Sequence, residues 1–431
     1  MRHLVKDPAT FNATIGVWLD GPLDIVRMRW AVQTALRRHE IFRTRFHEDG
    51  KWTGEPVQSV FKNTRAIFED VTVADSEAAL IGFRELEHHE YDLEAGDTVK
   101  VVDFHWSDHE HFFVVGYHHT ITDGQSYELF MREISKLYDG ETMDSPPQYA
   151  DFSVRQRKDL DEGRMDNDMS YWESIYATLP PVLPLMPLSQ TTTRSEATAW
   201  EYHEGSVLLD PLIADRVRDC SRKHKADPIH FFLAAFQTLL TCHSGDTDFS
   251  IGLSEMNRES LDDLATLGFL INLLPLRLKC TIESTFAEII DEAKSQVRGA
   301  LMQSKVPFDV LLQRLNIPRA STHAPLFQAA FDYRQGWYMT GLAIDDCLAD
   351  DMSAGQSQSV DFGTAKFKDL VMSRSRNAND IALEVVKPPT GKTKITLKLQ
   401  TSIYAEEDVM PLLKSYSEGR RYQRSDLKPW H

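Results

Sequence analysis

The residues whose types and spacing are best suited to catalysis lie together in GYHHTITDGQ, residues 116–125. An apolar run, HFFVV, leads to His118 and His119, and Asp123 and Gly124 follow at a turn. Histidine is the usual general base because its pKa lies near neutral pH. Asp123 could orient the imidazole of His119, or instead pair with a distant arginine and fix the turn. Gly124 would let the backbone approach a substrate closely.

A metal site and a polar strand end without chemistry are the other interpretations of the paired histidines. Further histidines stand nearby in the sequence, at His88, His89, His105, His109 and His111. The chain has no HExxH motif and no Cys/His set with zinc spacing, so we expect no metal and a solvated polar turn at 105–111. The motifs GxSxG, GxxxxGK[ST] and GxGxxG are absent too, which argues against a serine hydrolase and a phosphate-binding loop.

Composition narrows the function classes further. The formal net charge of −18 over 431 residues argues against a general affinity for nucleic acid or an anionic membrane. No apolar run reaches 18 residues, so no transmembrane helix is expected, and the N-terminus lacks the apolar core of a signal peptide. The cysteines are scattered without a CxxC pair and predict reduced thiols in a cytoplasmic protein: Cys220, Cys242, Cys280 and Cys347.

Rigid elements must hold the histidines in place. The runs TVKVVDFHW and HFFVVGY, joined by SDHE, predict a β-hairpin that ends at the histidine pair. A helix is expected from the Asp-Gly turn to Gly140, and two earlier ones after Asp24 and over Ser76 to His89. In the second half, Pro211 and the Asp227-Pro228 pair predict helix starts. Strands are expected at GSVLL, DFSIGL, LFQAAFDY, IALEVV and KITLKLQ, and an amphipathic helix at TFAEIIDEAKSQVRGALMQ.

A proline-rich and Ser/Thr-rich stretch, residues 177–199, divides the chain. We therefore expect an N-terminal subdomain over 1–176, a linker over 177–199, a C-terminal subdomain over 200–415 and a tail over 416–431. Each half mixes helices with strands. The order predicts an α/β (α+β) fold with two such layers rather than a strict βαβ alternation.

Several segments resemble one family in the same order along the chain. HHTITDG resembles the HHxxxDG signature of the condensation domains of nonribosomal peptide synthetases. RRHEIFRTRF (37–46), YADFSVRQR (149–157), IGLSEMNR (251–258) and GFLINLLPLRL (268–278) are similar to further motifs of that family. SKVPFDVLLQRLNIPR and PLFQAAFDYRQG look most like the branch found in fungal polyketide–peptide hybrid synthases, which includes the lovastatin-type synthases.

The resemblance implies two chloramphenicol-acetyltransferase-like halves that form a V around a central tunnel. It implies that His119 is the catalytic histidine, and we assign His118 a supporting role. Asp123 matches an aspartate that pairs with an arginine, here Arg258. Two further residues match tunnel and substrate-binding positions of the family, Gly124 and Asn272.

The function implied is transfer of a carrier-bound polyketide or acyl thioester to a nucleophile, and the expected nucleophile is the amine of a carrier-bound amino acid, which would form an amide. The expected partners are acyl or peptidyl carrier domains and other synthase domains in cis, and no cofactor of its own is expected because the carriers bring phosphopantetheine. Two alternatives stay open: a module that binds carrier or chain without transfer, and a free acyl-CoA acyltransferase. The sequence departs from the family pattern in three places: the first motif is missing, Gln303 replaces a histidine, and residues 345–380, where the family has the crossover between the halves, match poorly.

Overall fold

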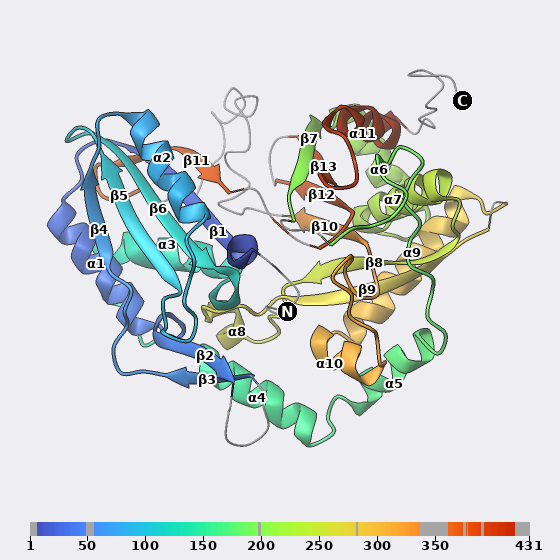
Figure 1. The fold of residues 1–431 in the computed structure, drawn as a ribbon, viewed down its shortest axis with the longest axis horizontal. Coiled ribbons are helices and arrows are strands. Elements are labelled where there is room, and N and C mark those ends of the chain that lie inside the picture. The colour runs from blue at the N-terminus through green and yellow to red at the C-terminus, as the bar shows by residue number, and fades with distance from the viewer. Residues whose placement is uncertain are drawn as a thin grey trace.

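A computed structural model describes residues 7–48, 56–196, 200–281, 283–335, 361–373, 376, 378–388 and 392–418. Two halves lie beside each other, and each is built on one large sheet with helices packed against it (Figure 1). The mixed α/β class predicted from the sequence is therefore present in both halves. Cys347 and most of the poorly matching segment lie outside the described residues.

The N-terminal half contains a five-stranded sheet in the order β11-β1-β6-β5-β4. Helices α1 and α3 cover one face of this sheet and α2 covers the other. The elements of this half are β1 (Asn12–Asp20), α1 (Ile25–Arg38), β2 (Thr44–Glu48), β3 (Pro56–Val60), β4 (Phe68–Thr72), α2 (Ser76–Glu87), β5 (Val99–His105), β6 (Glu110–His118), α3 (Gly124–Tyr138) and α4 (Tyr149–Asp161). Short 3-10 turns cover Pro8–Phe11, Glu40–Arg43 and His119–Ile121.

The predicted hairpin is the centre of this sheet. Strands β5 and β6 pair antiparallel from Val99↔Tyr117 to His105↔His111. Strand β6 is buried along nearly its whole length because helices cover both faces. Its last residue, His118, is thus fixed by a rigid strand at the edge where the candidate site begins.

The C-terminal half contains a six-stranded sheet in the order β7-β13-β12-β10-β8-β9. Helices α6, α7, α9 and α11 gather on the side of this sheet away from the N-terminal half (Figure 1). The elements are α5 (Asp166–Ile175), β7 (Tyr202–Leu208), α6 (Pro211–Lys223), α7 (Pro228–Ser244), β8 (Asp248–Glu255), α8 (Leu261–Ala265), β9 (Asn272–Lys279), α9 (Phe286–Met302), α10 (Phe308–Arg314), β10 (Ala329–Gln335), β12 (Ile381–Lys387), β13 (Lys394–Gln400), a 3-10 turn (Glu406–Asp408) and α11 (Val409–Glu418).

Two elements cross the subdomain limits expected from the sequence. Strand β11 (Lys366–Met372) falls in the expected C-terminal subdomain, yet it pairs antiparallel with β1 in the N-terminal sheet. Helix α5 falls in the expected N-terminal subdomain, yet its Trp172 is buried in the C-terminal core. Among the described residues, the chain therefore enters the C-terminal half before α5 and is back in the N-terminal sheet at β11.

The returning segment is anchored beside α3. Phe362 is fully buried, with its ring 5.7 Å from that of Phe113 and 5.9 Å from that of Tyr138. Ser135 of α3 donates a hydrogen bond of 2.6 Å to the carbonyl of Asp361. These contacts help to hold the helix that Asp123 caps.

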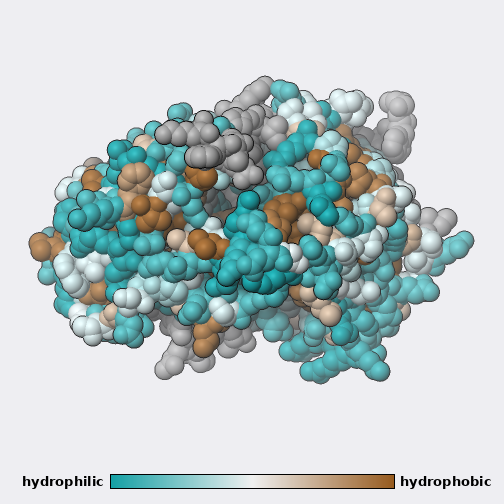
Figure 2. All heavy atoms as spheres, turned by 90° about the horizontal axis from the view of Figure 1, so that it is seen from below, coloured by the Kyte–Doolittle hydropathy of each residue, from teal (hydrophilic) through white to brown (hydrophobic). Residues whose placement is uncertain are grey.

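The surface agrees with the polar composition. On the face shown in Figure 2, hydrophobic residues form small separate groups among hydrophilic ones. Among the described helices, none combines the length and the apolar character that a membrane span requires.

Candidate active site

The turn after β6 presents the residues singled out in the sequence. The strand ends at His118, the 3-10 turn His119–Ile121 follows, and Asp123 caps α3. The Asp123 Oδ1 atom accepts a hydrogen bond of 2.8 Å from the main-chain N–H of Ser126, as helix-capping aspartates do. The local sequence thus fixes His119 between a rigid strand and the start of a helix.

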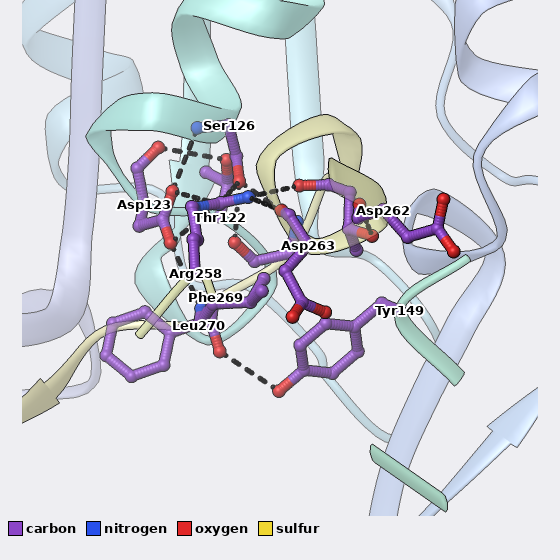
Figure 3. Close-up of polar contacts among 11 residues, drawn as sticks. Thr122, Asp123, Ser126, Tyr149, Arg258, Asp262, Asp263, Phe269 and Leu270 are labelled. Carbon is purple, nitrogen blue, oxygen red and sulfur yellow. Dashed lines mark hydrogen bonds and ion pairs between the residues drawn. The ribbon is translucent and has the colours of Figure 1, made fainter. Parts of the chain in front are cut away.

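Asp123 and Arg258 are in direct contact (Figure 3). Arg258 Nη2 lies 2.9 Å from Oδ1 and 3.0 Å from Oδ2 of Asp123, and both side chains are almost completely buried. The same Nη2 donates to Ser126 Oγ at 2.8 Å. The arginine comes from the loop between β8 and α8, so the pair predicted from the sequence joins the two halves.

Main-chain groups of the C-terminal half complete this network. Arg258 Nη1 donates to the carbonyls of Asp263 and Thr266 at 2.5 and 2.7 Å, and the Leu270 N–H donates to Asp123 Oδ2 at 3.0 Å. Among the described residues, the Asp123 carboxylate accepts hydrogen bonds from the Ser126 N–H at the helix cap, from Arg258 and from the Leu270 N–H. Its hydrogen bonds favour a structural role in fixing the loop over a role in orienting His119.

The ring of His119 points toward the C-terminal half. It meets the ring of Phe269 edge to face at 5.4 Å and that of Tyr117 at 6.2 Å. The side chain is partly exposed, and its Nδ1 atom is buried without a hydrogen-bond partner among the described residues. Of the two histidines, His119 is the one whose imidazole is uncommitted at the junction between the halves.

Phe269 is in turn held by Tyr149 of α4. The Tyr149 hydroxyl donates to the Phe269 carbonyl at 3.1 Å. Burial, and then the negative charge of Asp123, raise the pKa of Tyr149 to about 12, so the hydroxyl stays protonated near neutral pH. Tyr149 is therefore a permanent donor that positions the main chain next to His119.

His118 faces another part of the N-terminal half. Its Nδ1 atom accepts a hydrogen bond of 3.2 Å from the Thr120 N–H, and its ring meets Phe11 edge to face at 6.2 Å. The side chain is only 8% exposed. It caps the 3-10 turn that carries His119, which fits the supporting role expected from the sequence.

Gly124 and Asn272 occupy contrasting surroundings. A Cβ atom added to Gly124 would meet no atom within 4 Å, so the first residue of α3 borders open space. The Asn272 amide donates to the carbonyls of Ser304 and Val306 at 2.8 Å, and its oxygen accepts from the Phe308 N–H at 3.0 Å. Those bonds favour shaping of the 304–308 segment over direct substrate contact for Asn272, whose substrate-binding role stays a prediction.

The hairpin histidines differ from the solvated turn expected from the sequence. His109 is exposed, but His111 is only 2% exposed, and its Nδ1 lies 2.9 Å from Oδ2 of the buried Asp103. His105 lies opposite it on β5, and both approach the buried Asp103. The prediction of a solvated turn is therefore correct for His109 and wrong for His111.

Sequence reasoning missed three residues that organise the site, Ser126, Tyr149 and Phe269. Ser126 Oγ donates to the carbonyl of Gly268 at 2.7 Å and accepts from its N–H at 3.0 Å, which ties α3 to the C-terminal half. Tyr149 and Phe269 both lie within segments that show the family resemblance. Their position in these segments could have indicated that they belong to the site. The residues next to them in the sequence do not indicate the contact between the two halves.

Comparisons with known proteins agree with this geometry. A family model described as "Condensation domain" matches residues 1–418, so the chain belongs to the condensation-domain family. The lovastatin nonaketide synthase mokA of Monascus pilosus is 40% identical over 96% of this chain, which corresponds to 14% of that synthase. A polyketide synthase-nonribosomal peptide synthetase of Aspergillus clavatus is 32% identical over 96% of this chain and 10% of its own length. The chain thus spans a small part of the curated relatives that it matches.

Solved structures give the same result for the fold. The condensation domain from the monacolin K polyketide synthase MokA is 39% identical, with a TM-score of 0.83 over 97% of this chain and 93% of that one. The first condensation domain of the calcium-dependent antibiotic synthetase is only 16% identical but reaches a TM-score of 0.71 over 97% of this chain and 92% of that one. The predicted class, two chloramphenicol-acetyltransferase-like halves, is confirmed, and the chain is a condensation domain of the kind found in fungal polyketide synthesis.

Proposed function

We propose that this domain joins a carrier-bound polyketide or other acyl thioester to the amine of a carrier-bound amino acid and forms an amide. The observation that carries the proposal is the placement of His119. Its imidazole is partly exposed at the junction of the halves, in edge-to-face contact with Phe269, while Asp123 and Arg258 hold the loop beneath it. His119 is thus available for proton transfer, and the Asp123–Arg258 ion pair has the different role of positioning it.

In the proposed reaction the amine nitrogen attacks the thioester carbonyl carbon as His119 accepts a proton from the amine. The tetrahedral intermediate then collapses, the C–S bond breaks, and the thiol of the donor carrier leaves with a proton. The developing oxyanion needs nearby hydrogen-bond donors. The main-chain N–H of Gly124, at the positive end of α3, is the candidate donor, because the open space beside it would admit the reacting carbonyl.

The relatives support the choice of substrates and partners. They include polyketide synthases and hybrid synthetases, of which this chain covers about a tenth to a seventh of the length. We infer that the donor chain is a polyketide, that the phosphopantetheine belongs to carrier domains of the same synthase, and that the domain works in the cytoplasm and uses no cofactor of its own in the transfer reaction. Because the chain is acidic, carriers that are also acidic must dock on local basic or apolar patches.

Single-turnover assays with loaded carriers test the proposal. The donor carrier is loaded with an acyl chain, the acceptor carrier with an amino acid, and the amide product is identified by mass spectrometry. We expect faster transfer from acyl-carrier than from the same acyl-CoA. Equal efficiency with acyl-CoA would favour a free acyltransferase, whereas carrier binding without transfer to any tested amine or alcohol would favour a binding module.

A further inference from the structure

Four metal-ligating side chains converge at the end of the N-terminal sheet opposite to His119. Strand register places Asp70 of β4 beside Asp103 of β5, and His105 of β5 opposite His111 of β6. Because residues two apart on a strand share a face, Asp103 and His105 point to the same side. Three adjacent strands therefore bring two carboxylates and two imidazoles onto one face.

The facing atoms of these side chains lie close together. Asp103 Oδ2 is 2.9 Å from His111 Nδ1 and 3.7 Å from His105 Nδ1. Asp70 Oδ1 is 3.2 Å from His105 Nδ1. One nitrogen or oxygen atom from each of Asp103, His105 and His111 lies within 4.8 Å of the other two.

Negative charge at this position lacks a matching cation. Asp103 is fully buried, and its Oδ1 atom has no hydrogen-bond partner among the described residues. Within that part of the chain, the only arginine or lysine in an ion pair with either carboxylate is Arg29, whose Nη2 is 4.0 Å from Asp70. A buried carboxylate is costly unless a positive charge accompanies it. Two protonated histidines or one divalent cation would supply that charge.

The outer nitrogens of the two imidazoles favour the divalent cation. His111 Nε2 lies 3.4 Å from the carbonyl of Asp108, and His105 Nε2 lies 3.1 Å from Thr72 Oγ1. When these outer nitrogens carry the hydrogen, both Nδ1 lone pairs point at the carboxylates. This is the arrangement of metal-binding histidines, in which the second ring nitrogen is held by a carbonyl or another polar group.

We propose that Asp103, His105 and His111 bind a zinc ion, with Asp70 as the fourth ligand. Two imidazole nitrogens and two carboxylate oxygens form a ligand set that zinc accepts in tetrahedral geometry. The two aspartates also neutralise its charge. His105 and Asp70 are partly exposed, with side chains 21% and 27% accessible, which gives the ion a route from solvent.

Its position makes this zinc structural. His111 and His118 are seven residues apart on β6, or roughly 23 Å at the rise of a strand. Strand β4 is the edge of the five-stranded sheet, and a bound zinc would tie it to β5 and β6. The ion therefore stabilises the sheet that supports the active-site turn without taking part in the transfer reaction.

Zinc titration of the chelator-treated protein tests the proposal, with bound metal measured by elemental analysis and calorimetry. The variant is His105→Ala, and the matched control is His109→Ala, an exposed histidine on the same hairpin. We expect one zinc per chain in the wild type and in His109→Ala, a melting temperature that rises by roughly 3–6 °C at saturation, and loss of both effects in His105→Ala. Cobalt in place of zinc should give the intense visible absorption of a tetrahedral site.

Zinc binding that is equal in His105→Ala and the wild type would overturn the proposal, as would a wild type that binds no zinc. A cluster charged by protons alone would give an apoprotein whose melting temperature zinc does not change. To separate ligand loss from misfolding, circular dichroism of each apoprotein is compared, and Asp70→Asn provides a second, partly exposed ligand variant. Zinc affinity in Asp70→Asn should fall at least about tenfold, and unchanged affinity would remove Asp70 from the ligand set.

Discussion

Arg258 Nη2 lies 2.9 Å and 3.0 Å from the two carboxylate oxygens of Asp123, and this ion pair bridges the two halves of the chain. Both partners are buried, and the remaining hydrogen bonds of Arg258 Nη1 go to main-chain carbonyls. Loss of either partner of such a buried ion pair destabilises the protein, because the other partner is left as an uncompensated buried charge. The aspartate of the signature sequence is thus part of the framework of the site.

Arg258→Ala should lower both stability and activity. Removing one partner of a buried ion pair commonly costs about 3–5 kcal/mol of unfolding free energy. Denaturant or thermal unfolding measures the stability, and single-turnover transfer measures the activity. Arg157→Ala is the control, since Arg157 pairs with Asp161 on the surface of α4 and exposed pairs contribute about 0–1 kcal/mol. Equal melting temperatures for Arg258→Ala and the wild type would contradict the structural role of the pair.

Local signals in the sequence predicted the elements that hold the site. The apolar strand, the histidine pair and the Asp-Gly turn lead directly to β6, the 3-10 turn and α3. Asp24 caps α1 as expected, accepting a hydrogen bond of 3.0 Å from the Arg27 N–H. These features depend on neighbouring residues, and strand patterning and helix capping can therefore reveal them.

Features that depend on contacts between residues far apart in the sequence were harder to predict. Strand β1 was not assigned, although it is the partner of both β6 and β11. Nothing in KFKDLVM, the sequence of β11, indicates that it pairs with β1, more than 340 positions earlier in the chain. The burial of His111, only 2% exposed, was not predicted either, because it depends on how the strands pack in the sheet and not on the polar residues that surround it in the sequence.

Tyr149→Phe should lower the transfer rate more than it lowers stability. The variant loses the 3.1 Å hydrogen bond from the partly buried Tyr149 hydroxyl to the Phe269 carbonyl but keeps the aromatic ring in place. We expect a loss of about 1 kcal/mol or less in stability and about a tenfold lower rate, since small displacements beside reacting groups are costly. Phe269→Leu tests the ring contact with His119 separately. Unchanged turnover in both variants would show that this contact does not position His119.

Gly124→Leu should block the substrate and preserve the fold. A Cβ atom at this position enters open space, whereas one at Gly252 would lie 2.3 Å from the ring of Phe327. Gly124→Leu should therefore keep the wild-type melting temperature while transfer of bulky acyl chains falls. Gly252→Ala is the contrasting variant and should lose stability by overpacking, by about 1–3 kcal/mol. If Gly124→Leu transferred bulky chains as fast as the wild type, Gly124 would not border the substrate path.

His119→Ala should remove most of the chemistry without unfolding the protein. An amine acceptor is largely protonated at neutral pH and must lose a proton before or during attack, and a positioned general base contributes about 10²–10⁴-fold. That range corresponds to roughly 3–5 kcal/mol at 1.36 kcal/mol per tenfold change in rate. Stability should change little because the imidazole is partly exposed and its Nδ1 is unpartnered among the described residues.

His118→Ala should show the opposite balance. It removes the acceptor for the Thr120 N–H, so we expect a loss of about 1 kcal/mol in stability and a smaller effect on rate. Single-turnover transfer from a loaded donor carrier measures the chemistry, and circular dichroism with carrier-binding assays controls for folding and docking. A His119→Ala domain that transfers at nearly the wild-type rate would rule out His119 as the base. A larger rate loss in His118→Ala than in His119→Ala would move the proton-transfer role to the buried histidine.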